Sequence, residues 1–281
     1  MDDTRVSIVT GGTSGIGWHT ARALAHRGDT VILVGRNPER CNAARERILA
    51  ELPEAVVDTR LADFASLAQV NALAGAIIAD YNRVDVLVNN AGGFYSTRQV
   101  SHDGFELTWA TNHLAPFLLT HRLLPVLRAS APSRIVNVSS AAHISTSINF
   151  DDLQAERSYS GLRAYAQSKL ANILFTYEVA HRLADSDVTA NALHPGFVAT
   201  GFGSKNTGMF MAVNGLLAKF FAISPEAGAR TSIALAMDPT LSQTTGLYFS
   251  QAKPVASSRA SYDVTSRRRL WELSMRQCGI A

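Results

Sequence analysis

The chain has 281 residues, of which 47% are hydrophobic and 17% are charged, and its formal net charge at pH 7 is +3. This composition is typical of a globular protein with a sizeable core and excludes a highly charged, disordered chain. The basic residues are scattered, and the one basic run, at positions 267–269, is only three residues long, so we expect no nucleic-acid partner.

Cysteine content and hydropathy indicate the compartment. The two cysteines, Cys41 and Cys278, are far apart and form neither a disulfide framework nor a metal-binding spacing. We therefore expect no metal and a reducing, cytoplasmic location. No signal peptide is recognisable at the N-terminus, and the apolar stretch 209–223 is too short to span a bilayer and contains Asn214 and Lys219, so we expect no transmembrane segment.

The first predicted unit is a strand, a glycine-rich turn and a helix. Residues 6–9 form a short apolar run, residues 10–17 read Thr-Gly-Gly-Thr-Ser-Gly-Ile-Gly, and a helical pattern covers 20–25. Glycines in the first strand-to-helix turn allow the backbone to approach a pyrophosphate, which rests on the helix N-terminus. The arrangement predicts a dinucleotide-binding fold.

The second predicted strand, residues 30–34, ends at a residue that selects the cofactor. An acidic residue at this position holds the ribose 2′-hydroxyl in NAD-selective sites, whereas here Gly35 and Arg36 follow the strand. A guanidinium suits a 2′-phosphate, so the sequence favours NADP(H), with Arg36 as the main determinant and Arg40 as a helper. The alternative is that Arg36 is an ordinary surface residue.

Strands and helices then alternate. The third strand is expected to start at 55–57 and to lead toward 61–64, and further strands are predicted at 84–88, 134–138, 188–193 and 246–250. Helices are predicted at 67–81, 104–128, 165–184, from Pro225 onward with Ser224 as N-cap, and around 270–273. Such alternation predicts an α/β fold: one Rossmann-type, doubly wound parallel sheet of about seven strands, with helices on both faces. No linker or repeat is visible, so we expect a single domain over residues 1–281.

Polar and small residues follow several predicted strands. Residues 89–93 read Asn-Asn-Ala-Gly-Gly after the fourth strand, and Ser139 and Ser140 follow the fifth. The carboxyl edge of an open parallel sheet is where ligands bind, and small residues allow close contact with a planar group. Within the helix predicted at 104–128, Pro116 is expected to distort the backbone near Asn112.

Tyr165 and Lys169 are four residues apart at the start of an apolar helical run. On a helix this spacing places the two side chains on one face. A phenol titrates near about 10 in water, and a neighbouring cation lowers that pKa and makes tyrosine a usable general acid or base. The sequence predicts this effect of Lys169 on Tyr165. Taken alone, the spacing is also that of a half-buried aromatic residue beside a solvated charge.

Together these motifs resemble the short-chain dehydrogenase/reductase family over essentially the whole chain. The family's Thr-Gly-x-x-x-Gly-x-Gly motif matches Thr10, Gly11, Gly15 and Gly17, its Asn-Asn-Ala-Gly motif matches 89–92, and its Tyr-x-x-x-Lys motif matches Tyr165 and Lys169. Asn112, Ser140, Pro195-Gly196 and Thr200 also occur in the family's order. The branch that looks most similar is that of the retinol dehydrogenases and the WW-domain oxidoreductase.

The resemblance implies a role for each matched residue. Tyr165 would be the acid/base, Lys169 would lower its pKa and bind the nicotinamide ribose, Ser140 would orient the substrate carbonyl, and Asn112 would hold a water of the proton relay. Ser139 is the alternative to Ser140. The implied cofactor-binding residues are Gly11, Thr13, Ser14, Gly15, Ile16, Gly17, Arg36, Asp63, Phe64, Asn90, Ala91, Gly92, Tyr165, Lys169, Pro195, Gly196, Val198 and Thr200.

The expected function is therefore an NADP(H)-dependent oxidoreductase that interconverts a ketone or aldehyde and an alcohol. Apolar residues in the segment at about 200–223, such as Phe210 and Met211, indicate a cover over a bulky hydrophobic small-molecule substrate, unless they belong to a core helix or a subunit interface. Alternatives are a carbonyl reductase that tailors a secondary metabolite such as a polyketide, a sugar-nucleotide epimerase or dehydratase, and a catalytically silent NADP-binding sensor or scaffold. The family is commonly dimeric or tetrameric, so a homo-oligomer is expected.

Overall fold

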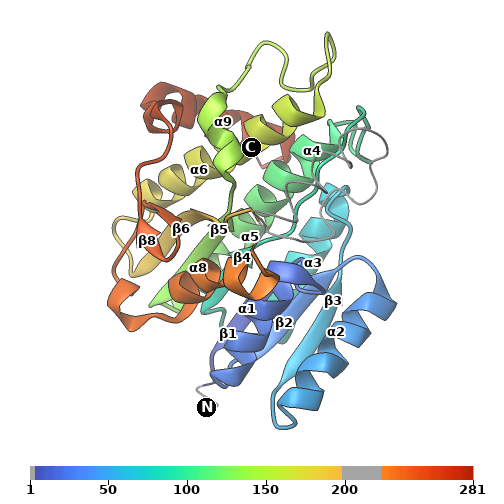
Figure 1. The fold of residues 1–281 in the computed structure, drawn as a ribbon, viewed down its shortest axis with the longest axis vertical. Coiled ribbons are helices and arrows are strands. Elements are labelled where there is room, and N and C mark those ends of the chain that lie inside the picture. Colours follow the sequence, from blue (N-terminus) through green and yellow to red (C-terminus); the bar gives the residue numbers. More distant parts are fainter. Residues whose placement is uncertain (1–3, 198–222, 281) are drawn as a thin grey trace.

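The computed structural model describes residues 4–197 and 223–280, which form one eight-stranded sheet with helices on both faces (Figure 1). The strands are β1 (Val6–Thr10), β2 (Thr30–Gly35), β3 (Val57–Leu61), β4 (Val86–Asn89), β5 (Ser133–Val138), β6 (Val188–His194), β7 (Tyr248–Ser250) and β8 (Lys253–Pro254). Their order is β3-β2-β1-β4-β5-β6-β7-β8, and all neighbours are parallel except β7 and β8. The doubly wound parallel sheet is confirmed; the strand that the sequence did not indicate is the two-residue β8.

The helices are α1 (Gly15–His26), α2 (Pro38–Glu51), α3 (Leu67–Asp80), α4 (Leu107–Trp109), α5 (Ala115–Ala129), α6 (Gly161–Arg182), α8 (Pro225–Met237) and α9 (Val264–Gln277). Apolar residues of α1, α2 and α8 pack on one face of the sheet, and those of α3, α5 and α6 pack on the other. None of the described helices is both long and apolar enough to cross a membrane.

Two helix starts combine a side-chain cap with a proline in the first turn, and the one at Ser224 was expected from the sequence. Asn37 accepts a hydrogen bond from the Arg40 amide at 2.8 Å, and Pro38 occupies the first turn of α2. Ser224 likewise accepts from the Ala227 amide at 3.1 Å, with Pro225 in the first turn of α8. Both caps satisfy amides that would otherwise lack a partner inside the helix, and proline has no such amide to satisfy.

The helix predicted at 104–128 is interrupted. α4 continues into a π-helical turn, η1 (Ala110–Leu114), and only then into α5. An α-helix would need an amide N–H at position 116 for the Asn112 carbonyl, and Pro116 has none. The predicted distortion is therefore present, and its result is a single π turn that contains Asn112.

The C-terminal helix α9 covers α5 and α6. Trp271 contacts Phe117 of α5 and Phe175 of α6, with ring centroids 5.0 and 6.2 Å away. Arg267 pairs with the buried carboxylate of Glu178 on α6 at 2.8 Å. Since Glu178 is 2% exposed, this ion pair is largely shielded from solvent and fixes α9 against the core.

The strand order changes direction between β1 and β4, and this point is where the sheet opens for a ligand. The Thr10 hydroxyl accepts hydrogen bonds from the amides of Asn90 and Ala91 at 2.9 and 3.0 Å and donates to the Val88 carbonyl at 3.2 Å. The turn after β1 and the loop after β4 are thereby joined. Gly17 lies so close to this turn that a Cβ atom on it would overlap the Gly11 carbonyl oxygen.

We expect Gly17→Ala to lower the free energy of unfolding by about 1–3 kcal/mol, because the new methyl group must displace the backbone of the glycine-rich turn. Gly75→Ala is the matched control: Gly75 lies inside α3 with no atom within 4 Å of the added Cβ, so it should gain about 0.5–1 kcal/mol. Denaturant titration of both variants measures the difference, and equal stabilities would contradict the crowding at Gly17.

Candidate active site

The predicted catalytic residues meet at the carboxyl end of β5. Ser140 follows this strand, and Tyr165 and Lys169 project from successive turns of α6. The Tyr165 hydroxyl is hydrogen-bonded to the Ser140 side chain. The Lys169 Nζ atom lies 5.6 Å from the centre of the Tyr165 ring and donates to the Val138 carbonyl at 3.0 Å. The spacing of four residues thus brings a cation to one side of the phenol, and the end of β5 brings a hydroxyl to its oxygen.

The two neighbouring serines have different partners. Ser139 is buried and its hydroxyl donates to the Lys169 carbonyl at 2.7 Å. Ser140 turns the other way: its hydroxyl bonds to Tyr165 and accepts from the Ala142 amide at 3.2 Å. Of the two hydroxyls, the one at position 140 is therefore the one in contact with the phenol.

Burial dominates the electrostatics of the pair. It raises the pKa of Tyr165 to about 12, opposed only by the hydrogen bond from Ser140, and it lowers the pKa of Lys169 to about 8. The net shift of the Tyr165 pKa is therefore upward, opposite to the direction that the sequence predicted. Loss of hydration disfavours the phenolate, and an ammonium over the ring, in hydrogen-bond contact with a carbonyl, does not compensate for it.

Asn112 uses every polar position of its side chain. Its Oδ1 accepts from the Gly93 amide at 2.7 Å and from the Thr111 hydroxyl at 3.3 Å, and its Nδ2 donates to the Gly93 carbonyl at 2.9 Å and to Ser168 Oγ at 3.0 Å. The side chain thus connects the loop after β4 to α6.

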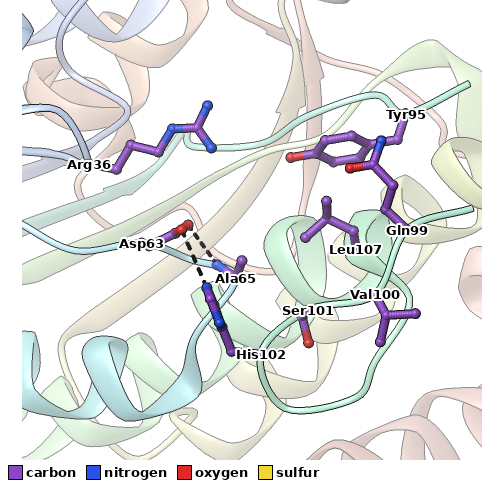
Figure 2. A pocket seen from close by; sticks show the side chains of 9 residues that line it. All are labelled: Arg36, Asp63, Ala65, Tyr95, Gln99, Val100, Ser101, His102 and Leu107. Carbon is purple, nitrogen blue, oxygen red and sulfur yellow. Dashed lines mark hydrogen bonds and ion pairs between the residues drawn. The ribbon is translucent and has the colours of Figure 1, made fainter. Parts of the chain in front are cut away.

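A cavity of about 310 Å³ runs along the carboxyl ends of β1, β2 and β4. Its walls contain eight of the residues expected to bind a dinucleotide or to help do so: Gly11, Thr13, Arg36, Arg40, Asp63, Phe64, Ala91 and Gly92. A second cavity of about 300 Å³ shares Arg36, Asp63 and Tyr95 with the first; Figure 2 shows Arg36 and Asp63 on one side and Tyr95 on the other. The predicted cofactor residues from four separate loops are therefore gathered around one space.

Several other predicted cofactor residues are described by the structure but do not line this cavity. Ser14, Gly15, Ile16 and Gly17 form the start of α1, where the Ser14 side chain makes no capping hydrogen bond. Asn90 donates to the carbonyls of Thr10 and Gly11, so its side chain supports the turn. Pro195 and Gly196 follow β6, and Gly196 has a positive φ of 89°. Val198, Thr200 and almost all of the predicted cover at 200–223 lie outside the described residues.

The side chain of Arg36 is available to a ligand. It follows β2, is exposed, and makes no ion pair with any residue in the described ranges. Asp63, on the same side of the shared cavity, has partners instead: its Oδ1 accepts from the Ala65 amide at 3.0 Å and its Oδ2 lies 4.0 Å from His102 Nε2 (Figure 2). The cavity therefore has a cationic group on the side where the second strand ends.

Comparison with known proteins identifies the family. A model of the short chain dehydrogenase family matches residues 5–209. The chain belongs to this family. It is 43% identical to retinol dehydrogenase 13 of Homo sapiens over 279 residues, which cover 97% of this chain and 84% of that protein, and this similarity supports the retinol dehydrogenase branch.

Two solved structures show the same fold. A crystal structure of an uncharacterized protein from Mycobacterium paratuberculosis has 34% identity and a TM-score of 0.79, covering 98% of this chain and 93% of that one. A single-residue variant of actinorhodin polyketide ketoreductase, crystallised with NADPH, has 25% identity and a TM-score of 0.68, covering 89% and 96%. As a short-chain dehydrogenase, the protein uses a nicotinamide cofactor to interconvert alcohol and carbonyl groups.

The structure also reveals site residues that the sequence did not indicate. The Phe94 ring meets the Tyr165 ring edge-on at 6.0 Å and forms part of the first cavity. Tyr95 lies in both cavities, and its hydroxyl bonds the Thr111 side chain. The only available signal was position, since both residues directly follow the small residues at 89–93; no spacing rule distinguishes them from other loop aromatics.

The lowered pKa of Lys169 predicts a pH effect on stability. Its folded pKa is about 8 against an ordinary value of 10.5, so between these values the unfolded chain carries the extra proton and raising the pH stabilises the folded state. We expect the free energy of unfolding of the parent, relative to Lys169→Met, to increase from pH 8 to 10.5. Lys253→Met, which removes an exposed lysine from β8, is the control for loss of a lysine side chain. A pH-independent difference for Lys169→Met would contradict the assignment.

Proposed function

We propose that this short-chain dehydrogenase is an NADP(H)-dependent oxidoreductase that interconverts a ketone or aldehyde and an alcohol, with Tyr165 as acid/base. The observation that carries the proposal is the position of Gly92. It lies in the wall of the first cavity, and a Cβ atom on it would be 3.6 Å from Lys169 Nζ and 3.0 Å from Asn112 Oδ1. One residue of the cavity wall is therefore adjacent to two of the proposed catalytic residues, which a cofactor that reaches both the cavity and those residues would require.

The residues around this cavity fit a dinucleotide. A Cβ atom at Gly11 would lie 3.0 Å from Ala91 Cα and from Asn90 Nδ2, so only a glycine leaves the backbone open to a close ligand. Ser14 precedes α1 with a side chain that makes no capping bond, and the first amides of that helix suit a pyrophosphate. The cofactor, when bound, supplies the hydride donor or acceptor.

The protein's own residues handle the proton and the substrate oxygen. With a pKa of about 12, Tyr165 is protonated at neutral pH and can donate to a carbonyl oxygen being reduced. We assign Ser140 rather than Ser139 as the hydroxyl that orients this oxygen, because Ser140 contacts the phenol. Lys169, with a pKa of about 8, is mostly charged at neutral pH and would bind the ribose and favour proton loss from Tyr165 once the site is complete. The Asn112 carbonyl would hold the relay water.

The preference for NADP(H) is supported by Arg36. Its guanidinium lies at the end of β2 beside the cavity, where a 2′-phosphate would be placed, and Arg40 is in the same wall. The similar ketoreductase was crystallised with NADPH. A carboxylate at this position, which would select the 2′-hydroxyl of NAD(H), does not occur.

A bulky hydrophobic substrate is supported by the residues that flank the catalytic hydroxyls. Leu162, three residues before Tyr165 on α6, is 60% exposed, and Ile144, in the turn after Ser140, is 66% exposed. Phe94 adds an aromatic ring beside Tyr165. Retinol dehydrogenase 13 and the polyketide ketoreductase are both named for large substrates, so a retinoid-like alcohol and a polyketide-like ketone are the two candidate classes. The proposed cover at 200–223 would complete this pocket.

Other parts of the proposal concern alternatives and context. A catalytically silent sensor is disfavoured because Ser140, Tyr165 and Lys169 are all present and in contact range.

A cytoplasmic location is supported by Cys41 and Cys278, which are both unpaired. For a homodimer or homotetramer, the surfaces of α5 and α6 beneath α9 are already covered by the chain itself, so the subunits would have to use other faces.

Replacing Tyr165 with Phe should reduce kcat by about 10²- to 10⁴-fold while cofactor affinity stays within a few-fold, because only the proton donor is lost. NADPH consumption with a panel of hydrophobic ketones and aldehydes measures turnover, and quenching of protein fluorescence measures cofactor binding. Tyr81→Phe, which removes a hydroxyl bonded to Asp58 far from Ser140, should leave kcat unchanged. Activity of the Tyr165 variant within a few-fold of the parent would refute the role.

Arg36→Asp should weaken NADPH binding by about 10- to 100-fold and relatively favour NADH, because a carboxylate repels a 2′-phosphate and accepts from a ribose hydroxyl. Arg128→Asp makes the same change of charge on α5, in an exposed pair with Asp185, and should alter neither affinity. Kd values for both cofactors are measured by the same fluorescence titration. Equal use of NADPH and NADH by the parent would contradict the preference.

A further inference from the structure

His143 lies directly behind the catalytic serine. It belongs to the short turn Ala141–Ser145 that follows Ser140, and its side chain is completely buried. Its Nδ1 atom is 2.7 Å from the Ser140 carbonyl oxygen, which also accepts from the His143 amide at 3.2 Å. The Ser140 backbone is therefore held from two directions by one residue.

The opposite ring nitrogen fixes the tautomer. His143 Nε2 is 3.0 Å from the backbone nitrogen of Ser258, in the segment between β8 and the C-terminal helix. A backbone N–H can only donate, so Nε2 must carry the lone pair and Nδ1 must carry the proton. His143 is thus neutral, accepts from Ser258 and donates to the Ser140 carbonyl.

The surroundings keep the ring neutral. Burial lowers the pKa of His143, against a weaker opposite effect of the bond to Ser140, and also lowers the pKa of the neighbouring His194. The Tyr248 ring packs edge-on against His143 at 4.9 Å and lies 6.3 Å from the His194 ring. His194 on β6 and Tyr248 on β7 are the titratable groups that face His143 from these two strands. Protonation of His143 would place a second N–H, on Nε2, against the Ser258 N–H.

We propose that His143, as the Nδ1–H tautomer, is a positioning residue that fixes the Ser140 hydroxyl against Tyr165 and couples it to the segment around Ser258. This inference rests on the proposed function. The Ser140 hydroxyl has its own backbone partner, the Ala142 amide at 3.2 Å, in the same turn. If the His143 ring no longer holds the carbonyl, the turn can rotate and the hydroxyl moves away from the phenol, and misplacement by about 1 Å can cost about 100-fold in rate.

The first test compares His143→Asn with His143→Gln. The Asn amide reaches the position of Nδ1 and can still donate to the Ser140 carbonyl, whereas the Gln amide reaches the position of Nε2 and leaves the carbonyl without this donor. We expect kcat to fall about 10- to 100-fold for Gln and only a few-fold for Asn, with the KM for NADPH unchanged in both because His143 is not in the cavity wall. Equal kcat values at equal folded fractions would overturn the proposal.

A second pair of variants leaves His143 in place. Ser258 has φ of −65°, which proline adopts, and in Ser258→Pro a ring carbon replaces the N–H that fixes Nε2, so the imidazole has to move away from Ser258. Ser258→Ala retains the N–H and is the matched control. We expect kcat to fall several-fold for Pro and to be unchanged for Ala; identical kcat values would count against the coupling to Ser258.

Nuclear magnetic resonance of chains labelled with ¹⁵N in the histidine rings tests the tautomer independently of turnover, with His143 assigned from the signals lost in His143→Asn. The expected result is an Nδ1–H tautomer in the parent and in Ser258→Ala at neutral pH, and a mixture of tautomers in Ser258→Pro. An Nε2–H tautomer in the parent would overturn the proposal even if no carbonyl or alcohol were turned over. Absence of turnover with the expected tautomer would instead refute the proposed function.

Discussion

The hydroxyl of Thr10 is the contact on which the site depends. It accepts from two consecutive amides after β4 and donates to the β4 backbone, and so it joins the two loops at which the strand order changes direction. Because Thr10 is the last residue of β1, the central sheet fixes the position of the glycine-rich turn that follows it. The same arrangement places Gly17 in close contact with Gly11. It also forms the cavity, whose wall residue Gly92 lies next to Lys169.

Much of the fold could be predicted because its signals are local. Buried parallel strands such as β2 are uninterrupted apolar runs, and helix starts such as Asn37-Pro38 and Ser224-Pro225 satisfy backbone groups within a few residues. The two-residue strand β8 could not be predicted, since it exists only through pairing with β7. The position of α9 depends on contacts such as Trp271 with Phe117, which are distant in sequence and have no local signature.

The sequence predicted which residues form the site better than it predicted their pKa values. Motif spacing brought together Ser140, Tyr165 and Lys169, yet the direction of the Tyr165 pKa shift was wrong, because spacing on a helix says nothing about how completely a group is removed from water. Tyr95 and His143 could not be assigned roles from the sequence. Tyr95 lines the cavities only because its loop folds in this way, and the role proposed for His143 depends on a contact with Ser258, 115 residues away. The choice between Ser139 and Ser140 likewise required the orientation of the strand end.

The placement of α9 has a consequence for biosynthesis. Trp271 covers aromatic residues of α5 and α6 that are translated long before it, and Arg267 neutralises Glu178 in the same region. Contacts between such distant residues form late, and until they form the apolar surface of α5 and α6 remains open. The nascent chain therefore leaves the ribosome with its central helices exposed, and α9, which emerges after them, completes this part of the core. Chaperones have their greatest opportunity to bind during that interval.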